Sequence, residues 1–349
     1  MTIDLIGWDI GGAHVKAVAL AGEEIVSVIQ KPCPLWMGLG HFHDTAHAIL
    51  KELKLEPACR HAVTMTGELA DVFASRVEGV FSLLRAFCEH VPFENILVFA
   101  GPLGFLSAHQ VQAKDVAAIA SANWLATGLY AASRLDQGLL IDIGSTTTDL
   151  LLLHPGEVLT RGHTDYERLR HGELLYCGVV RTSLMSLTKL APFEGEWIGL
   201  MAEHFATTAD IYRLTGELPG HADQSPTADG GEKTAMASAR RIARLLGRDV
   251  ESSTTKSWKV LAFYFRERQL EGLMEASMRQ LSRGLLDGDA PLIGAGVGRF
   301  LVQELAQRLG HTYLDFADLH PDTLHTSEFH LADCAPALAV ACLARQSHV

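Results

Sequence analysis

The sequence contains few of the signals that direct a chain into a membrane or an oxidising compartment. Its six cysteines form no C-x-x-C pair. The N-terminus lacks the basic and then apolar pattern of a secretory signal, and no uncharged apolar run reaches the ~18 residues that a membrane helix requires. We therefore expect a reduced, cytoplasmic protein without a membrane partner.

Basic residues are also scarce. Lysine and arginine together number 29 against 41 aspartates and glutamates, which gives a net charge of −12 and a pI near 5.8. Such a charge disfavours nucleic acids and anionic membranes as partners. Local basic residues would have to meet an anionic ligand, so we expect a small-molecule ligand and no nucleic acid.

The length and the apolar content favour two domains. The 349 residues exceed the size at which one core usually keeps growing, and 48% of them are hydrophobic. We predict an N-terminal domain at 1–135 and a C-terminal domain at 136–330, with an inserted helical subdomain at about 163–283. A C-terminal helix within 331–349 is expected to pack between the halves.

The apolar pattern is typical of an α/β fold. Strands are predicted at 5–8, 15–20, 24–30, 61–66 and 95–100 in the first half, and at 139–141, 150–153, 157–160, 291–293 and 312–316 in the second. Helices are predicted at 44–53, at 113–134, up to 309 and at 332–344. A segment rich in Gly, Pro, Asp and Ser at 220–231 is expected to be a mobile loop.

Two similar turns stand out, at 9–16 and at 142–149. Each lies between two apolar runs, so each is predicted to be a hairpin tip that carries a carboxylate and glycine. Glycine lets backbone N–H groups approach phosphate, hydroxyl groups donate further bonds, and carboxylates bind Mg²⁺. The predicted Mg²⁺ ligands are Asp9 and Asp142. The predicted phosphate-binding residues are Gly11, Gly12, Lys16, Gly144, Ser145, Thr146 and Thr147.

Two further segments offer phosphate contacts. Gly294 and Gly296 precede a predicted helix, whose first N–H groups attract anions. Arg181 follows a glycine-containing strand, and its guanidinium could grip a diphosphate with two hydrogen bonds. The alternative for the glycines is an ordinary turn, and for Arg181 and Lys16 an ordinary surface or strand position.

The segment 64–71 follows a predicted strand and carries two carboxylates, Glu68 and Asp71. Either is a candidate general base, although acidic residues are also common at helix starts for structural reasons. Lys16 completes the candidate catalytic residues. The histidines His41, His43 and His47 are not spaced on one helical face, and we interpret them as surface residues.

The paired turns resemble the phosphate-binding loops of the actin, heat-shock-70 and sugar-kinase superfamily, in which two ribonuclease-H-like domains flank a cleft. A narrower resemblance, to hydantoinase/oxoprolinase-related proteins of the tetrahydromethanopterin-linked one-carbon pathway, covers nearly the whole chain. Its motifs lie at 7–16, 64–71, 122–124, 142–149, 172–181 and 228–234. Archaeal relatives include a methanofuran-biosynthesis enzyme that joins an aminomethylfuran-methyl diphosphate to a tyramine-type phenol.

The resemblance implies a Mg²⁺-dependent transferase. A furanylmethyl diphosphate would lose pyrophosphate, and a tyrosine- or tyramine-type phenol would attack to form an ether. The turns would hold the diphosphate, Asp9 and Asp142 the metal, and Glu68 would deprotonate a phenol whose free pKa is near ~10.

Other functions remain open on the sequence. The same turns serve ATP equally well, in a small-molecule kinase or in an ATP-dependent amidohydrolase of the hydantoinase/oxoprolinase type. A non-catalytic nucleotide-sensing or assembly protein is a third class. The oligomeric state is also open, and a homodimer is one of the alternatives.

Overall fold

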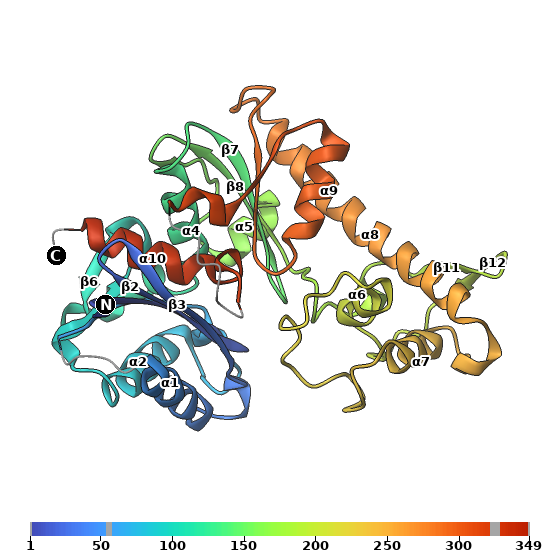
Figure 1. Cartoon of the computed structure of the whole chain (residues 1–349), viewed down its shortest axis with the longest axis horizontal. Coiled ribbons are helices and arrows are strands. Elements are labelled where there is room, and N and C mark those ends of the chain that lie inside the picture. Colours follow the sequence, from blue (N-terminus) through green and yellow to red (C-terminus); the bar gives the residue numbers. More distant parts are fainter. Residues whose placement is uncertain (1, 54–57, 322–328, 348–349) are drawn as a thin grey trace. The chain divides into compact units, whose positions relative to one another are not determined.

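The computed structural model describes residues 2–53, 58–321 and 329–347, and its contacts divide the chain into two compact units. Unit 1 comprises 1–137, 153–159 and 315–349, and unit 2 comprises 138–152 and 160–314. Each unit contains a β-sheet with helices packed on it, which confirms the predicted α/β class (Figure 1). No helix in these described ranges is long and apolar enough to cross a membrane.

The sheet of unit 1 has the order β3-β2-β1-β4-β5-β6. Strands β1, β2 and β3 pair antiparallel, whereas β4 pairs parallel to β1 and β5 parallel to β4. The strand bounds are Leu5–Ile10, His14–Ala21, Glu24–Pro32, Arg60–Met65, Ile96–Phe99 and Phe105–Ser107 for β1 to β6. The helices are α1 (Gly40–Leu53), α2 (Arg76–Cys88), α3 (Val116–Ile119), α4 (Asn123–Ala132) and α10 (Ala335–Gln346).

Strand β1 is buried along its whole length because helices cover both faces of the sheet. Successive side chains of a strand point to opposite faces. Trp8 packs edge-on against Phe87 of α2, with ring centroids 5.0 Å apart, while Gly7 lies against Ala337 of α10. This burial explains the nearly continuous apolar run at the start of the sequence.

Unit 2 repeats the same plan. Its sheet has the order β10-β8-β7-β13-β14, in which β13 pairs parallel to β7 as β4 does to β1. Strand β9 pairs with the end of β8, within the segment 153–159 that belongs to unit 1. The bounds are Gly138–Ile143, Thr148–His154, Glu157–Val158, Leu174–Leu175, Leu292–Ala295 and Tyr313–Asp315 for β7 to β10, β13 and β14. In both units a tight turn follows the first strand, and a later strand returns beside it.

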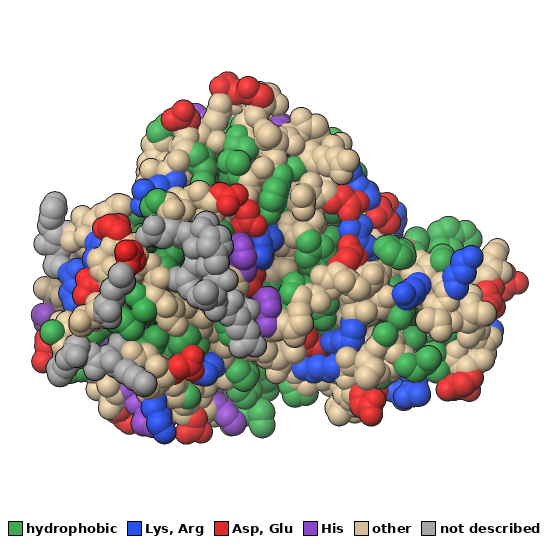
Figure 2. Space-filling model, in the orientation of Figure 1, with side chains coloured by type: hydrophobic (Ala, Val, Ile, Leu, Met, Phe, Trp, Pro, Cys, Tyr) green, Lys and Arg blue, Asp and Glu red, His purple; other side chains and the backbone are tan. Residues whose placement is uncertain are grey.

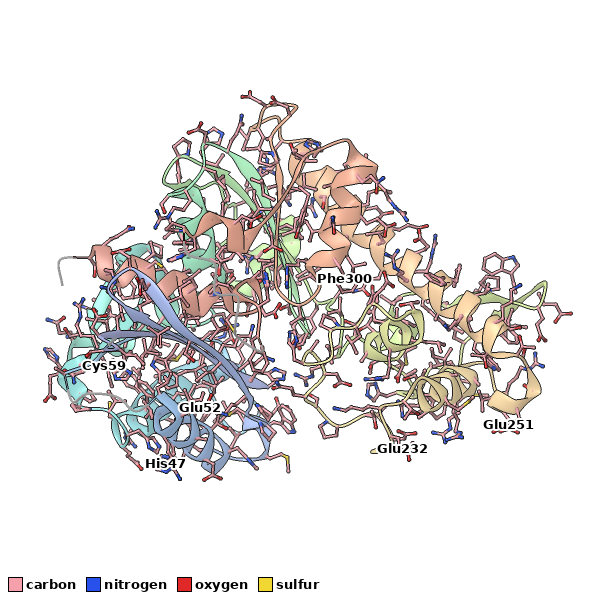
Figure 3. All side chains as sticks on the ribbon, in the orientation of Figure 1. His47, Glu52, Cys59, Glu232, Glu251 and Phe300 are labelled. Atoms are coloured by element: carbon pink, nitrogen blue, oxygen red, sulfur yellow. The ribbon has the colours of Figure 1, made fainter. Side chains whose placement is uncertain are left out.

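The segment between β9 and β13 is mainly helical, with a hairpin of β11 (Leu190–Phe193) and β12 (Glu196–Gly199). The helices are α5 (Asp165–His171), α6 (Thr208–Thr215), α7 (Ala235–Leu245) and α8 (Thr255–Leu281), and α9 (Arg299–Leu309) follows β13. Phe300 of α9, labelled in Figure 3, meets the Tyr212 ring of α6 edge-on at 5.2 Å.

Ion pairs connect α8 to α9. Arg266 of α8 pairs with Glu304 of α9, and Arg308 pairs with Glu267 at 2.9 Å. Figure 2 shows acidic and basic side chains interspersed over the part of unit 2 where these helices lie. Because residues of opposite charge lie next to one another, their ion pairs stabilise the packing of α8 on α9.

The loop at 220–231 is tied to neighbouring helices by ion pairs. Asp229 pairs with Arg241 of α7 at 3.0 Å, and Asp223 pairs with Arg213 of α6. The carbonyl of Glu232, labelled in Figure 3, accepts a further hydrogen bond from Arg241 at 3.1 Å. The segment was predicted to be mobile from its Gly, Pro, Asp and Ser content, and two of its aspartates anchor it to neighbouring helices.

The helix predicted at 113–134 is broken. Helix α3 ends at Ile119, and α4 begins only at Asn123. Between them Ser121 adopts φ 53°, a left-handed conformation that no right-handed helix contains, and Ala120 pairs with Met65 at the end of β4. The apolar, alanine-rich composition concealed this break, which a tertiary contact with the sheet stabilises.

The C-terminal helix α10 is part of unit 1, and its predicted place between the halves stays a prediction. It packs on β1, β2, β4 and α4. Small residues make this approach possible, because a Cβ on Gly7 would lie 1.9 Å from the Ala337 carbonyl oxygen and 2.9 Å from the Ala341 Cβ.

We expect Gly7→Ala to destabilise unit 1 by about 3 kcal/mol or more, because the added methyl must displace the α10 backbone and not a flexible side chain. Urea unfolding, followed by circular dichroism, measures this change. Gly40→Ala is the matched control, since a Cβ there has nothing within 4 Å. Equal stabilities of the two variants would contradict the close packing of α10 on β1.

His61 makes unit 1 sensitive to acid. It is 3% exposed, its Nδ1 accepts from Trp8 Nε1 at 3.0 Å, and burial lowers its pKa to about 4. The unfolded chain, with a His pKa near ~6.5, binds the proton more tightly, so stability falls as the pH drops from ~6.5 towards 4.

The protonation of His61 is expected to lower the free energy of unfolding by up to about 3 kcal/mol at the acid end of this range. Urea unfolding at pH 7 and pH 4.5 measures it. In His61→Phe the difference in the free energy of unfolding between pH 7 and pH 4.5 should be smaller by that amount. An unchanged difference would contradict a neutral buried imidazole.

Candidate functional site

The first glycine turn joins β1 to β2 in a tight hairpin. Asp9 pairs with Lys16 across the hairpin, and the Gly11 N–H donates to the His14 carbonyl at 3.0 Å. Asp9 is only 5% exposed, and its Oδ2 lies 4.0 Å from Lys16 Nζ. A cation opposite a buried carboxylate offsets part of the free-energy cost of removing that carboxylate from water. The hairpin therefore places one negative and one positive side chain beside the turn.

The two glycines of this turn serve different purposes. A Cβ on Gly11 would lie 2.8 Å from the His14 carbonyl oxygen, whereas one on Gly12 would have nothing within 4 Å. The turn itself therefore requires Gly11, while Gly12 leaves its backbone open to close approach. The Gly12 carbonyl accepts from the Leu35 N–H at 3.1 Å, which anchors the turn to the next segment.

The second glycine turn repeats the first. The Gly144 N–H donates to the Thr147 carbonyl at 2.9 Å, and Asp142 precedes Gly144 by two residues, as Asp9 precedes Gly11. Ser145, Thr146 and Thr147 are half-buried, and the hydroxyl oxygens of the first two are 3.4 Å apart. The same backbone pattern thus carries the same carboxylate at the end of the first strand of each unit.

The segment 178–182 lies directly against the second turn. The Val179 N–H donates to the Gly144 carbonyl at 3.1 Å, and the Arg181 N–H donates to the Ser145 carbonyl at 2.9 Å. Gly178 allows this contact, because a Cβ there would lie 2.5 Å from the Thr146 nitrogen. The backbone of Arg181 therefore reaches the turn, its side chain is exposed, and a phosphate contact by its guanidinium stays a prediction.

The loop after β13 also packs on the second turn. Gly296 has φ 77°, and a Cβ there would lie 2.5 Å from Asp142 Oδ1 and 2.3 Å from the Ile143 carbonyl oxygen. Gly296 thus lets the loop approach the carboxylate. Gly294 lies within β13, in register with Ile141, and faces the Tyr313 ring, and its phosphate contact stays a prediction.

The two carboxylates of the segment 64–71 are in different environments. Glu68 lies in a short 3-10 helix at Gly67–Leu69 and is 1% exposed, whereas Asp71 is exposed in the loop that follows. The Ser121 hydroxyl donates to Glu68 Oε1 at 2.9 Å. Gly79 of α2 supports the Glu68 backbone, since a Cβ there would lie 2.5 Å from the Glu68 carbonyl oxygen.

The last carboxylate of the second turn motif is structural. Asp149 Oδ1 accepts from Arg168 Nη2 of α5 at 2.8 Å, and Arg168 is 1% exposed. Burial raises the pKa of the Asp149 carboxyl, and the Arg168 guanidinium opposes that rise. This pair joins β8 to α5, so Asp149 has a different task from Asp142 within one motif.

Ser121, Gly79 and Gly178 were not identified from the sequence. Each acts through a contact with another segment of the chain, and even Gly178, which stands in the motif at 172–181, carries no local sign of that contact. The only local signal was a conformational one, since Ser is among the small polar residues that tolerate turns.

Magnesium fits the residues present if phosphate supplies the remaining ligands. In the described part of the chain no three His, Cys, Asp or Glu side chains are grouped to hold a metal ion. Mg²⁺ usually binds to one or two carboxylates, keeps several waters and takes the rest of its ligands from substrate phosphates. The buried Asp9 and the half-buried Asp142 each offer one such carboxylate beside a glycine turn.

Comparison with known proteins places these features in a family. The hydantoinase/oxoprolinase family model matches residues 60–334, which include Glu68, the second turn and Gly296. The fold is also that of acetone carboxylase in its nucleotide-free form, with a TM-score of 0.58 at 12% identity over 97% of this chain and 70% of that one. This similarity supports the ribonuclease-H-like architecture predicted for both units.

Two curated relatives are more similar in sequence. The (4-{4-[2-(gamma-L-glutamylamino)ethyl]phenoxymethyl}furan-2-yl)methanamine synthase of Methanocaldococcus jannaschii is 31% identical over 256 residues, 72% of this chain and 74% of that protein. The synthase of the same name from Methanococcus vannielii is 32% identical over 129 residues, 37% of this chain and 58% of that protein. The extent of the family match and the identity to the first synthase show that the chain belongs to the hydantoinase/oxoprolinase family.

Proposed function

We propose that this protein is an enzyme of methanofuran-type cofactor biosynthesis, which joins an (aminomethyl)furan-methyl diphosphate to a tyrosine- or tyramine-type phenol. The observation that carries the proposal is the 31% identity to the Methanocaldococcus jannaschii synthase. The name of that synthase describes a product in which a phenoxymethyl ether connects a phenol to a furan bearing a methanamine group. The reaction is a furanylmethyl transfer that forms this ether.

The chemistry breaks one C–O bond and forms another. The exocyclic methylene carbon of the furan loses pyrophosphate, which departs with the bonding electron pair, and the electron-rich ring stabilises the positive charge left on that carbon. The phenol oxygen then attacks the carbon, and the phenol proton passes to the Glu68 carboxylate. The products are the ether and one pyrophosphate, so the reaction needs no ATP.

The two glycine turns supply the phosphate-binding groups of this proposal. Gly11 and Gly144 shape the two turns through their own backbone hydrogen bonds. The N–H groups of Gly12 and Gly296, the hydroxyls of the second turn, and the cations Lys16 and Arg181 stabilise the leaving diphosphate. Asp9 and Asp142 would hold Mg²⁺, which would neutralise charge on the phosphates. Burial raises the pKa of the Cys177 thiol, next to the second turn, which disfavours the thiolate that a nucleophilic role requires.

The main alternative is ATP-dependent chemistry, as a small-molecule kinase or an amidohydrolase of the oxoprolinase type. The loop at Gly296 favours it most, because a glycine loop packed on a carboxylate-bearing turn could also contact a nucleotide. The six cysteines are free and four of them are buried, which supports a reducing cytoplasm. The homodimer stays an open prediction.

One incubation distinguishes these reactions. Purified protein, Mg²⁺, the furan diphosphate and a tyramine-type phenol should yield the ether and one equivalent of pyrophosphate without ATP, as measured by mass spectrometry and a pyrophosphate assay. ATP hydrolysis that a small molecule stimulates, without ether formation, would contradict the transferase and favour the ATP-dependent alternative.

A further inference from the structure

The break between α3 and α4 contains a strained residue. Ser121 has φ 53°, which is one of two positive values among the non-glycine residues that the structure describes. A left-handed conformation of a non-glycine residue costs of order 1 kcal/mol or more and persists only where the surroundings impose it. Here the neighbouring Ala120 forms a parallel bridge with Met65, at the end of the strand that leads to Glu68.

The strained position brings one hydroxyl to one carboxylate. Ser121 Oγ donates to Glu68 Oε1 at 2.9 Å, and the two residues are 8% and 1% exposed. Glycine would adopt the same φ without strain, so the hydroxyl is what serine adds at this position. Gly79 of α2 lets that helix pack closely against the Glu68 backbone. The Ser121 hydroxyl therefore fixes one carboxylate oxygen, and α2 limits where the Glu68 backbone can lie.

We propose that Ser121 is a positioning residue, which orients the Glu68 carboxylate to receive the phenol proton; this inference rests on the proposed function. A serine hydroxyl is a neutral donor that fixes one oxygen of a carboxylate and stabilises its charge less than a lysine or arginine would, so it weakens the base less. The strained backbone keeps the hydroxyl in place, so little reorganisation is required when the substrate binds.

Two substitutions separate the hydroxyl from the backbone. Ser121→Gly removes the hydroxyl and the strain, whereas Ser121→Ala removes the hydroxyl and keeps the strain. If the hydroxyl positions Glu68, both variants should lose about 10- to 100-fold in kcat, with the KM for the furan diphosphate changed by less than about threefold. Thermal unfolding should show Ser121→Gly to be the more stable of the two.

Two comparisons test whether the effect acts through Glu68. Ser133→Ala removes a hydroxyl that donates to the Tyr130 carbonyl at 2.7 Å in α4, and its kcat should stay near that of the wild type. In a Glu68→Gln background, Ser121→Ala should change kcat by less than about threefold, because the residues act as one unit. Ser121→Asn, which tolerates the left-handed conformation and carries an amide donor, should recover part of the activity.

A kcat within about twofold of the wild type in both Ser121→Gly and Ser121→Ala would overturn the inference, as would losses that multiply fully in the double variant. The wild-type assay separates this result from a failure of the proposed function. If the wild type forms no ether and hydrolyses ATP instead, the transferase is wrong, and the same variants assayed for ATP turnover then decide the role of Ser121.

Discussion

Asp9→Asn is expected to lower kcat by about 1,000-fold while the protein remains folded, because the amide removes one of the carboxylates proposed to hold Mg²⁺. Losing several kcal/mol of charge stabilisation at the departing pyrophosphate corresponds to roughly this factor. Asp142→Asn should have a comparable effect. Steady-state kinetics across a Mg²⁺ titration measures both variants, and each should require more Mg²⁺ for half-maximal rate.

Matched controls distinguish the metal role from the loss of a charge in general. Asp4 stands at the start of the same sheet and pairs with Arg345 at 3.1 Å, so Asp4→Asn should leave kcat within about twofold. Asp136 is exposed just before β7, so Asp136→Asn is the matched control for Asp142→Asn and should also leave kcat within about twofold. Near-wild-type activity of Asp9→Asn with an unchanged Mg²⁺ dependence would reject the assignment.

Glu68→Gln has the second large expected effect, a loss of about 1,000-fold in kcat at neutral pH. At pH 7 little phenol is ionised, because its own pKa is near ~10, so the reaction then lacks a base. The rate of Glu68→Gln should rise as the pH approaches ~10, where free phenolate accumulates, whereas the wild-type rate should depend less on pH in this range. Initial rates of ether formation from pH 6 to pH 10 test this.

Asp71→Asn decides between the two carboxylates of the segment. Asp71 is exposed, so its replacement should change kcat by less than about threefold, and the loss in Glu68→Gln should be much larger. The opposite order would transfer the role of the base to Asp71. A full loss in Glu68→Gln without recovery at high pH would indicate that Glu68 acts on a step other than proton removal.

Much of the secondary structure was predictable because its signals are local. Apolar runs that end at glycine marked β1, β2, β4, β5 and β7, and each of them lies within two residues of its predicted position. Helix α1 begins at Gly40, earlier than the predicted 44, because its first turn has few apolar residues. The predicted helix at 113–134 was wrong for a non-local reason, since Ala120 pairs with a strand that lies far away in the sequence.

The residues of the candidate site also fall into those with a local signal in the sequence and those without one. The residues of the two turns could be identified because the carboxylate and the glycines of each turn lie within eight consecutive residues, and because the turn occurs twice. They are Asp9, Gly11, Gly12, Asp142 and Gly144. The roles of Gly178 and Gly296 depend on contacts with the second turn from elsewhere in the chain. Such contacts leave no periodicity in the sequence, so only coordinates reveal them.

The sequence by itself determined that two similar turns, each with a carboxylate and glycine, follow apolar strands in an acidic α/β chain, because hydrophobic periodicity and turn chemistry act between neighbouring residues. Only the tertiary structure decided which polar side chains are buried and which of them contact one another. It separated the buried Glu68 from the exposed Asp71, and it assigned Asp149 to an ion pair with Arg168 and Ser121 to a hydrogen bond with Glu68. These choices depend on burial, and burial is a property of packed elements that no local pattern encodes.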